Sequence, residues 1–276
     1  MGGENGEPEE RSPSPEWSAL AGETARVPRA AIVDEWEACV EALETDSQRS
    51  VAVLRGVAAL AAEDPDAVEH TIVDVAPYAS SGATNVRQQA TLVLARLAEH
   101  HPGSVAVAVD QLGVTVANAP DLPSRRRATT ALARLARTEP EAVARVADRL
   151  VSQLESDDDF LGEDAALALG RITHRGTLPV DLDLDVDDLL PLYVAALGAQ
   201  FRRAVRVDAL DDCLAVGEEL DDLLASVTGC EGLRDTLSVI LDAVDVAAAH
   251  GGVAPEPLRD RVAAVAERAE RVTEER

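Results

Sequence analysis

Three arginines recur at a regular spacing in the middle of the chain, and their side chains are suited to binding anions. Arg96, Arg134 and Arg171 are 38 and 37 residues apart, and each directly precedes the last apolar residue of a helix-like triplet. Ala59 stands at the corresponding earlier position. A guanidinium group holds a carboxylate or a phosphate through two parallel hydrogen bonds. The spacing therefore predicts an arginine column, made of these three residues, that binds an acidic partner.

The sequence around the arginine column is the basic stretch of a strongly acidic chain. From Arg87 to Arg149, nine arginines stand against six acidic residues, which gives this stretch +3 and the remainder −29. Four further arginines are candidates for the same surface: Arg125, Arg126, Arg127 and Arg137. The alternative is that these arginines form local salt bridges, and exposed pairs of that kind contribute only about 0–1 kcal/mol. The sequence leaves both interpretations open.

Two other groups of residues resemble metal sites but lack required ligands. The run Asp181–Asp188 begins like a calcium loop, yet Val186 stands where the loop needs glycine and Leu192 where it needs a bidentate glutamate. The order of residues in Glu69-His70 and Glu99-His100 is the reverse of the His-Glu pairs that bind two irons in some helical-repeat hydroxylases, and the repeated set is absent. We therefore predict no metal site and no cofactor.

The sequence shows no pattern typical of a catalytic centre. A Gly-rich phosphate loop, a nucleophile elbow and a credible catalytic triad are all missing. Cys39, Cys213 and Cys230 make no CxxC pair. Cys39 lies on an apolar helix stripe, which favours a small core residue over a reactive thiol. We predict no catalytic residues and a protein that is not an enzyme.

The composition indicates an unusual ionic setting. All 25 basic residues are arginine, 51 residues are acidic, and the formal charge is −26. Such a composition resembles that of proteins from extreme halophiles, which keep molar salt in their cytoplasm. Self-repulsion is screened there because the Debye length falls to about 3 Å at 1 M salt. An acidic protein of an ordinary high-GC bacterium is the alternative, and the absence of lysine argues against it.

Charge and composition also bear on partners and location. Phosphate contacts lose affinity steeply with salt, and aromatic residues are only 2% of the chain, so a nucleic-acid partner is disfavoured. No apolar run approaches the ~20 residues that span a membrane. The N-terminus lacks a basic region followed by an apolar stretch. We expect a cytoplasmic protein with a protein partner; the sequence does not decide its oligomeric state.

The elements that must position the arginine column are pairs of amphipathic helices. Apolar residues at i, i+4 and i+7 mark the second helix of each pair. These triplets are Val53-Val57-Leu60, Ala90-Leu94-Leu97, Ala128-Leu132-Leu135 and Ala165-Leu169-Ile172, with last members 37, 38 and 37 residues apart. Longer stripes mark the first helices: Ile32-Trp36-Cys39-Leu43, Val68-Ile72-Val75-Ala79, Val105-Val109-Leu112-Val116, Val143-Ala147-Leu150-Leu154 and Val186-Leu190-Tyr193-Leu197. A fixed period of this length, made of two helices, predicts an α-solenoid in which stacked repeats share a continuous core.

Part of the chain resembles the HEAT-repeat family. The residues that carry the resemblance are Val86-Arg87-x-x-Ala90 and Ala165-Ala166-x-Ala168-Leu169-Gly170-x-Ile172, and it extends over about Ala30–Leu214. The resemblance implies an all-α, right-handed α-solenoid of antiparallel helix pairs with a C-terminal capping helix. It also implies a non-enzymatic adaptor that binds a protein partner on the concave face lined by the second helices. A subunit related to HEAT-type lyases and a nucleic-acid-associated scaffold are the alternatives.

The same resemblance implies a ladder of Asp–Arg bonds between repeats. Its candidate members here are Arg87, Arg125, Asp121 and Asp157. Ser50 and Gly162 stand where the family has arginine, so we expect the ladder to be incomplete.

Three regions are expected along the chain. Residues 1–28 are rich in Gly, Glu, Pro and Ser and predict a disordered acidic tail. Residues 29–216 predict the solenoid, with about five helix pairs, the fifth formed by Leu190–Leu197 and Phe201–Val216. Residues 217–276 predict a helical cap or a diverged repeat. In its last helix, apolar residues from Leu258 to Val272 alternate in steps of four and three, which fits a capping helix or a coiled-coil contact with another chain.

Overall fold

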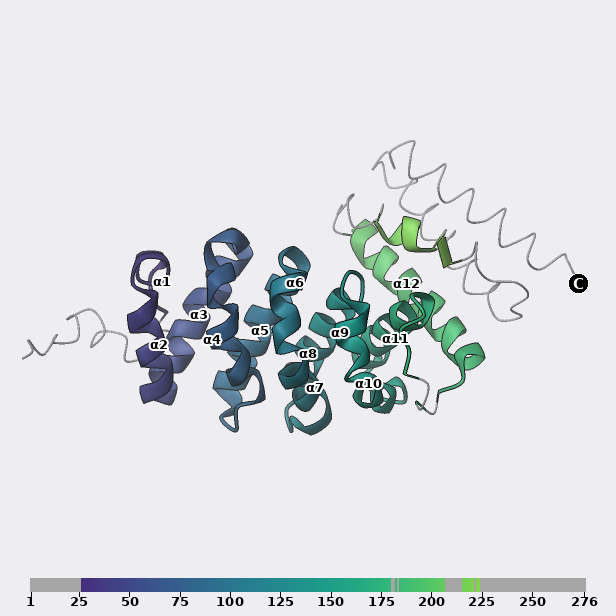
Figure 1. The fold of residues 1–276 in the computed structure, drawn as a ribbon, viewed down its shortest axis with the longest axis horizontal. Helices are drawn as coiled ribbons and strands as arrows, with labels where there is room; N and C mark the ends of the chain where they lie inside the picture. Colours follow the sequence, from purple (N-terminus) through teal and green to yellow (C-terminus); the bar gives the residue numbers. More distant parts are fainter. Residues whose placement is uncertain (1–25, 180–181, 183, 207–214, 221, 224–276) are drawn as a thin grey trace, which may run out of the picture.

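The protein is a row of stacked helices in the part of the chain that the structure describes (Figure 1). The structure is a computed structural model, and it describes residues 26–179, 182, 184–206, 215–220 and 222–223. Within these ranges all regular elements are helical. The predicted acidic tail up to residue 25 and the predicted cap from residue 224 onward, including its last helix, lie outside the described residues.

The helices form two layers. The second helices lie side by side in one layer, and each contacts the next along the chain: α3 (Ser47–Glu63), α5 (Thr84–His100), α8 (Leu122–Leu135) and α11 (Asp159–His174). The first helices form the other layer and are divided into short α and 3₁₀ segments, namely α1 (Arg29–Asp34), α2 (Trp36–Thr45), η2 (Pro65–Thr71), α4 (Ile72–Val75), η3 (Ala76–Ser80), α6 (Pro102–Val105), η4 (Ala106–Ala108), α7 (Val109–Asn118), α9 (Pro140–Ala144) and α10 (Ala147–Leu154).

Proline marks where three of the first helices begin. Pro65, Pro102 and Pro140 each occupy the first turn of η2, α6 and α9. Proline is tolerated there because the first N–H groups of a helix have no partner within the helix. Each of these prolines therefore marks the first turn of a new repeat, as their spacing along the sequence predicts.

The core lies between the two layers and continues from one repeat to the next. Every residue of the four predicted second-helix triplets is buried. The first-helix stripes are buried too, except that Trp36, Leu154 and Leu190 are partly exposed and Val186 is exposed. One helix pair could not bury these faces alone, and stacking supplies the missing cover. The prediction of an all-α solenoid of helix pairs is confirmed.

Ion pairs join neighbouring second helices where the next one begins. The buried Arg87 donates to Asp121, with its Nε atom 3.0 Å from Oδ2. Asp121 also accepts the backbone N–H of Ser124 at 3.0 Å and thereby caps α8. One repeat later, Arg126 donates from Nε to Asp158 at 2.9 Å, and Asp158 caps α11 through the N–H of Leu161. Each aspartate thus satisfies both a helix N-terminus and a guanidinium group of the preceding repeat.

This ladder uses residues next to two of those expected from the sequence. Arg126 and Asp158 form the second pair, whereas Arg125 and Asp157 were the expected members. Asp157 is exposed, and the Nε atom of Arg125 is buried without a hydrogen bond. Asp158 has the extended backbone of an N-cap residue at this turn, so its carboxylate is placed between the two helices.

The fifth helix pair differs from the sequence-based expectation. A single helix, α12 (Val186–Arg206), covers the predicted first helix and runs on past its end at Leu197, with Pro191 inside it. α12 packs against α11, where the ring of Tyr193 lies directly over Gly170. The absence of a side chain at Gly170 lets the two helices approach closely. This contact fixes α12, and with it Tyr193, at the end of the row.

Replacing Gly170 with alanine will lower the free energy of unfolding by about 1–3 kcal/mol, the usual cost of overpacking a core. A Cβ atom there would overlap the ring of Tyr193, so the two helices must separate. Urea denaturation followed by circular dichroism measures the change.

The matched control for this substitution is Gly162→Ala on the same helix. The nearest atom to an added Cβ at Gly162 is the Leu154 carbonyl oxygen at 3.5 Å, so this change adds no clash. It should stabilise the chain by about 0.5–1 kcal/mol, because glycine loses more entropy on entering a helix than alanine. Equal stability of the two variants would contradict the close α11–α12 packing.

Candidate binding surface

The arginine column lies on α5, α8 and α11, and one edge of each guanidinium group is bound by the fold. Arg96 donates from Nη1 to the carbonyl of Ala58, and Arg134 does the same to Ala95. Arg171 donates from Nη1 to the carbonyl of Ala133 at 2.6 Å. A helix carbonyl can accept this bond because its oxygen has two lone pairs.

Arg127 makes the same kind of bond, from Nη1 to the carbonyl of Gln88 at 2.6 Å. The repeat spacing found in the sequence therefore corresponds to a series of hydrogen bonds from arginine side chains to backbone carbonyls of the preceding second helix. This contact is part of the fold, and it leaves the outer edge of each guanidinium group for other partners.

The arginine side chains differ in how far they are exposed to solvent. Arg134 is 37% exposed, with its Nη2 atom 3.1 Å from the carboxylate of Glu99. Arg137, one turn further along the chain, is 43% exposed. Arg171 is only 5% exposed. The structure thus brings the arginines of the column together, but Arg171 is not open to a partner in this state.

An exposed aromatic ring lies between two further arginines. Phe160, at the start of α11, is half exposed, and the guanidinium carbons of Arg126 and Arg203 lie 5.0 and 5.6 Å from its ring centre. Such cation–π contacts orient both guanidinium groups. Arg203 also pairs with Glu163 at 2.5 Å. Phe160 and Arg203 were not predicted from the sequence; the signal for Phe160 was a large apolar residue directly after three aspartates, where a polar turn was expected.

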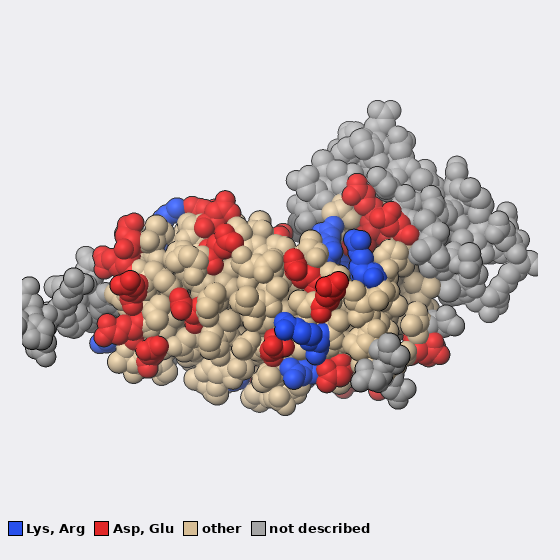
Figure 2. All heavy atoms as spheres, viewed as in Figure 1, with Lys and Arg blue, Asp and Glu red and all other residues tan. Residues whose placement is uncertain are grey.

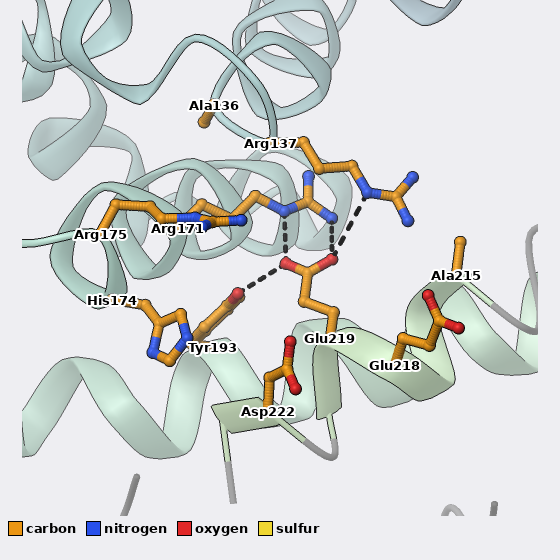
Figure 3. A pocket seen from close by; sticks show the side chains of 10 residues that line it. All are labelled: Ala136, Arg137, Arg171, His174, Arg175, Tyr193, Ala215, Glu218, Glu219 and Asp222. Carbon is orange, nitrogen blue, oxygen red and sulfur yellow. Dashed lines mark hydrogen bonds and ion pairs between the residues drawn. The ribbon is translucent and has the colours of Figure 1, made fainter. Parts of the chain in front are cut away.

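A polar pocket lies at the C-terminal ends of α8 and α11 (Figure 3). Arg171 holds the carboxylate of Glu219 with two hydrogen bonds, Nε to Oε1 at 2.5 Å and Nη2 to Oε2 at 2.8 Å. The hydroxyl of Tyr193 donates to Oε1 at 2.6 Å, and Nε of Arg137 lies 3.9 Å from Oε2. Beside these groups is a cavity of about 190 Å³, which His174 and other polar side chains line.

Burial and pairing set the charge states in this pocket. Burial alone would raise the pKa of Glu219, but the hydrogen bonds and positive charge of Arg171 offset it and lower the pKa overall. The pKa of Tyr193 is raised by burial and by the negative charge of Glu219, so its hydroxyl keeps its proton and donates. Arg171 and Glu219 therefore form a buried ion pair.

Acidic and basic residues are unevenly distributed on the face shown in Figure 2. Red side chains predominate over the α1–α4 end, while the larger blue patches lie over the half that contains α7 to α11. This agrees with the charge distribution along the sequence. Within the described ranges, no cluster of His, Cys, Asp and Glu has the arrangement of a metal site. None of the helices described has the length and apolar character needed to cross a membrane.

Comparison with models of protein families and with curated proteins found no match. The fold is similar to solved structures of designed repeat proteins. One engineered protein has 19% identity and a TM-score of 0.50, covering 87% of this chain and 98% of its own. A second has 18% identity and a TM-score of 0.51, covering 86% and 99%. A designed armadillo repeat protein, solved in complex with the peptide (KR)4, has 14% identity and a TM-score of 0.50, covering 84% and 98%.

At these identities the similarity concerns the fold alone. It agrees with the two-layer arrangement and with the continuous core described above. The assignment to the HEAT family and the halophilic origin stay predictions from the sequence. The chain is a helical repeat solenoid of the kind that these designed proteins share.

Proposed function

We propose that this chain is a non-enzymatic scaffold that binds an acidic segment of a protein partner on the exposed side of the second helices α5, α8 and α11, the face that the sequence predicts to be concave, in a cytoplasm of high salt. One observation carries the proposal: partly exposed guanidinium groups gather on α8, just after its end, and on α12, in an otherwise acidic molecule. They belong to Arg126, Arg134, Arg137 and Arg203, which are 42%, 37%, 43% and 40% exposed.

The fold holds these guanidinium groups in place before a partner arrives. Arg134 is bound to a backbone carbonyl, and Arg126 and Arg203 flank the ring of Phe160. Side chains that are already ordered lose less entropy on binding. Two parallel hydrogen bonds to a carboxylate then give a geometric preference for Asp and Glu side chains.

The present partners of Arg134 and Arg203 do not prevent exchange. Arg134 pairs with Glu99, and Arg203 with Glu163, in ion pairs that solvent reaches. Exposed pairs of this kind contribute only about 0–1 kcal/mol, so a partner's carboxylate can replace them at small cost. In high salt, where the Debye length is about 3 Å, the longer-range repulsion of an acidic segment by the acidic surface is screened.

The architecture supports binding of an extended segment. Equivalent side chains recur on neighbouring helices along the row, which suits a chain that lies across several repeats. The designed armadillo repeat protein of similar fold was solved with the charged peptide (KR)4. The sign of charge that we propose for the present partner is the opposite one, because the candidate surface carries arginines.

The test is the affinity for a fluorescein-labelled octaglutamate peptide in 1 M KCl, measured by anisotropy. We expect wild type to bind it and the double variant Arg134→Gln/Arg137→Gln to bind about tenfold more weakly, since two exposed charge pairs together contribute about 1–2 kcal/mol. Arg145→Gln/Arg149→Gln, which alters the first-helix side by the same charge, is the control. Failure of wild type to bind, or equal weakening by both double variants, would refute the proposal.

A further inference from the structure

We infer that Arg137, Arg171 and Tyr193 form a carboxylate-binding site at the end of the arginine column, which Glu219 of the same chain occupies until a carboxylate of the partner replaces it. This inference rests on the proposed function, which it extends by naming the group that the partner must displace. It is carried by the geometry around Glu219, by the equivalent position in the preceding repeat, and by the cavity next to the carboxylate.

The geometry is that of a dedicated carboxylate site. Both oxygens of Glu219 are bound by one guanidinium group, at 2.5 and 2.8 Å, and a tyrosine hydroxyl donates a third bond at 2.6 Å. The three donors come from α11 and α12, whose mutual position is fixed by the contact of Tyr193 with Gly170. Arg137, two residues after the end of α8, adds positive charge, with its Nε atom 3.9 Å from the carboxylate. The donors therefore do not depend on Glu219 for their placement.

Arg134, the equivalent arginine one repeat earlier, also binds a backbone carbonyl with one side of its guanidinium group and a carboxylate with the other. Arg134 gives Nη1 to the carbonyl of Ala95 and Nη2 to the carboxylate of Glu99, just as Arg171 gives Nη1 to Ala133 and its outer edge to Glu219. The difference is the source of the carboxylate. Glu99 belongs to the preceding second helix, whereas Glu219 comes from the segment 215–220, 48 residues beyond Arg171 and outside the regular repeat.

The cavity of about 190 Å³ gives an incoming group access to the site. Arg137, His174 and Arg175 line it on the solenoid side, and the three carboxylates of Glu218, Glu219 and Asp222 line it on the other (Figure 3). Arg175 and His174 are exposed, so the cavity opens to solvent next to the bound carboxylate. An acidic side chain that enters this cavity is attracted by Arg137 and Arg175, while its repulsion by Glu218 and Asp222 is screened in high salt.

Exchange of one carboxylate for another leaves Arg171 paired both before and after the exchange. A buried guanidinium group without a partner is strongly unfavourable, so a neutral or basic segment cannot displace Glu219. A carboxylate can, because it restores the same hydrogen bonds. The site therefore selects an acidic partner, and Glu219 lowers the apparent affinity for it by competition.

The first experiment compares Glu219→Gln with wild type for binding of the octaglutamate peptide in 1 M KCl. Glutamine has nearly the same shape but no charge, so it competes less well. We expect about tenfold tighter binding. Asp64→Asn, which removes the carboxylate of the Arg29–Asp64 pair at the far end of the row, is the matched control and should leave the affinity unchanged. If Glu219 only holds the chain together, its variant will bind no more tightly than wild type, and that result overturns the inference.

A second experiment tests the site without the peptide. Glu219→Ala leaves a space that acetate fits, so its thermal midpoint should rise more than that of wild type when 1 M potassium acetate replaces 1 M KCl. An equal rise in both proteins overturns the inference. If Glu219→Gln does not fold, Glu219→Asp takes its place in the peptide assay, with a smaller expected gain.

The two proposals fail in different ways. If neither wild type nor the Glu219 variants bind octaglutamate, the proposed function is refuted, together with the partner's part in this exchange. If wild type binds it and the Glu219 variants bind it equally well, only the exchange is refuted.

Discussion

Replacing Asp121 with alanine will lower the free energy of unfolding by about 3–5 kcal/mol, because it leaves the buried Arg87 without its counter-ion. Arg87 is 5% exposed, and both its Nε and Nη2 atoms donate to Asp121. The same change removes the cap of α8, which adds about 1 kcal/mol. Urea denaturation in molar KCl, followed by circular dichroism, measures the loss.

The control for Asp121→Ala is Asp157→Ala in the following repeat. Asp157 is exposed beside the capping residue, so its replacement should change stability by less than about 0.5 kcal/mol. A large loss at Asp157, or a small one at Asp121, would contradict the arrangement of the ladder.

Acid titration provides an independent check on Asp121. Burial alone would raise the pKa of this carboxyl, but the hydrogen bonds from Arg87, Gln88 and Ser124 hold the pKa well below its usual range. A folded-state pKa below the unfolded value of about 3.9 means that the unfolded chain binds the proton first as pH falls. The contribution of Asp121 is therefore fully present above about pH 4 and is lost as pH falls further. Asp121→Asn should differ from wild type by less at pH 3 than at pH 7.

Replacing Arg171 with alanine is the second change for which we expect a large effect, again about 3–5 kcal/mol of unfolding free energy. It leaves the carboxylate of Glu219, 14% exposed, without its bidentate partner. It also removes the hydrogen bond to the carbonyl of Ala133. Because Arg171 joins α8, α11 and the segment 215–220, we expect the loss to appear as earlier unfolding of this end of the row in hydrogen exchange as well as in urea.

The double variant Arg171→Ala/Glu219→Ala tests whether the loss comes from the ion pair. Removal of both charges should cost less than the sum of the two single changes, because neither charge is left buried alone. Strict additivity would show that the two groups are not coupled. Arg175→Ala, at an exposed position of the same pocket, is the surface control and should change stability by less than about 0.5 kcal/mol.

The candidate site was only partly predictable from its residues. The position of Arg96, Arg134 and Arg171 just before a buried residue showed that they would share a register on neighbouring helices. It did not show that each would bind a backbone carbonyl 38 or 39 residues earlier. That bond depends on the distance and the angle between packed helices. The apolar period of a single helix gives no information on either. The same holds for the ion pair of Arg126 and Asp158. Each of these residues lies one position after the residue that was expected from the sequence.

What the sequence determined by itself is the repeat: the helix pairs, their period, the buried faces and the basic stretch within an acidic chain. These follow from local periodicity, because a residue's place on a 3.6-residue turn decides whether it meets the core. The tertiary structure decided the rest. It made α12 one continuous helix, placed Phe160 between two arginines, and brought Glu219 onto Arg171. Those contacts join segments outside the regular period, so their partners are set by the three-dimensional packing of the chain and by the pairing that a buried charge requires.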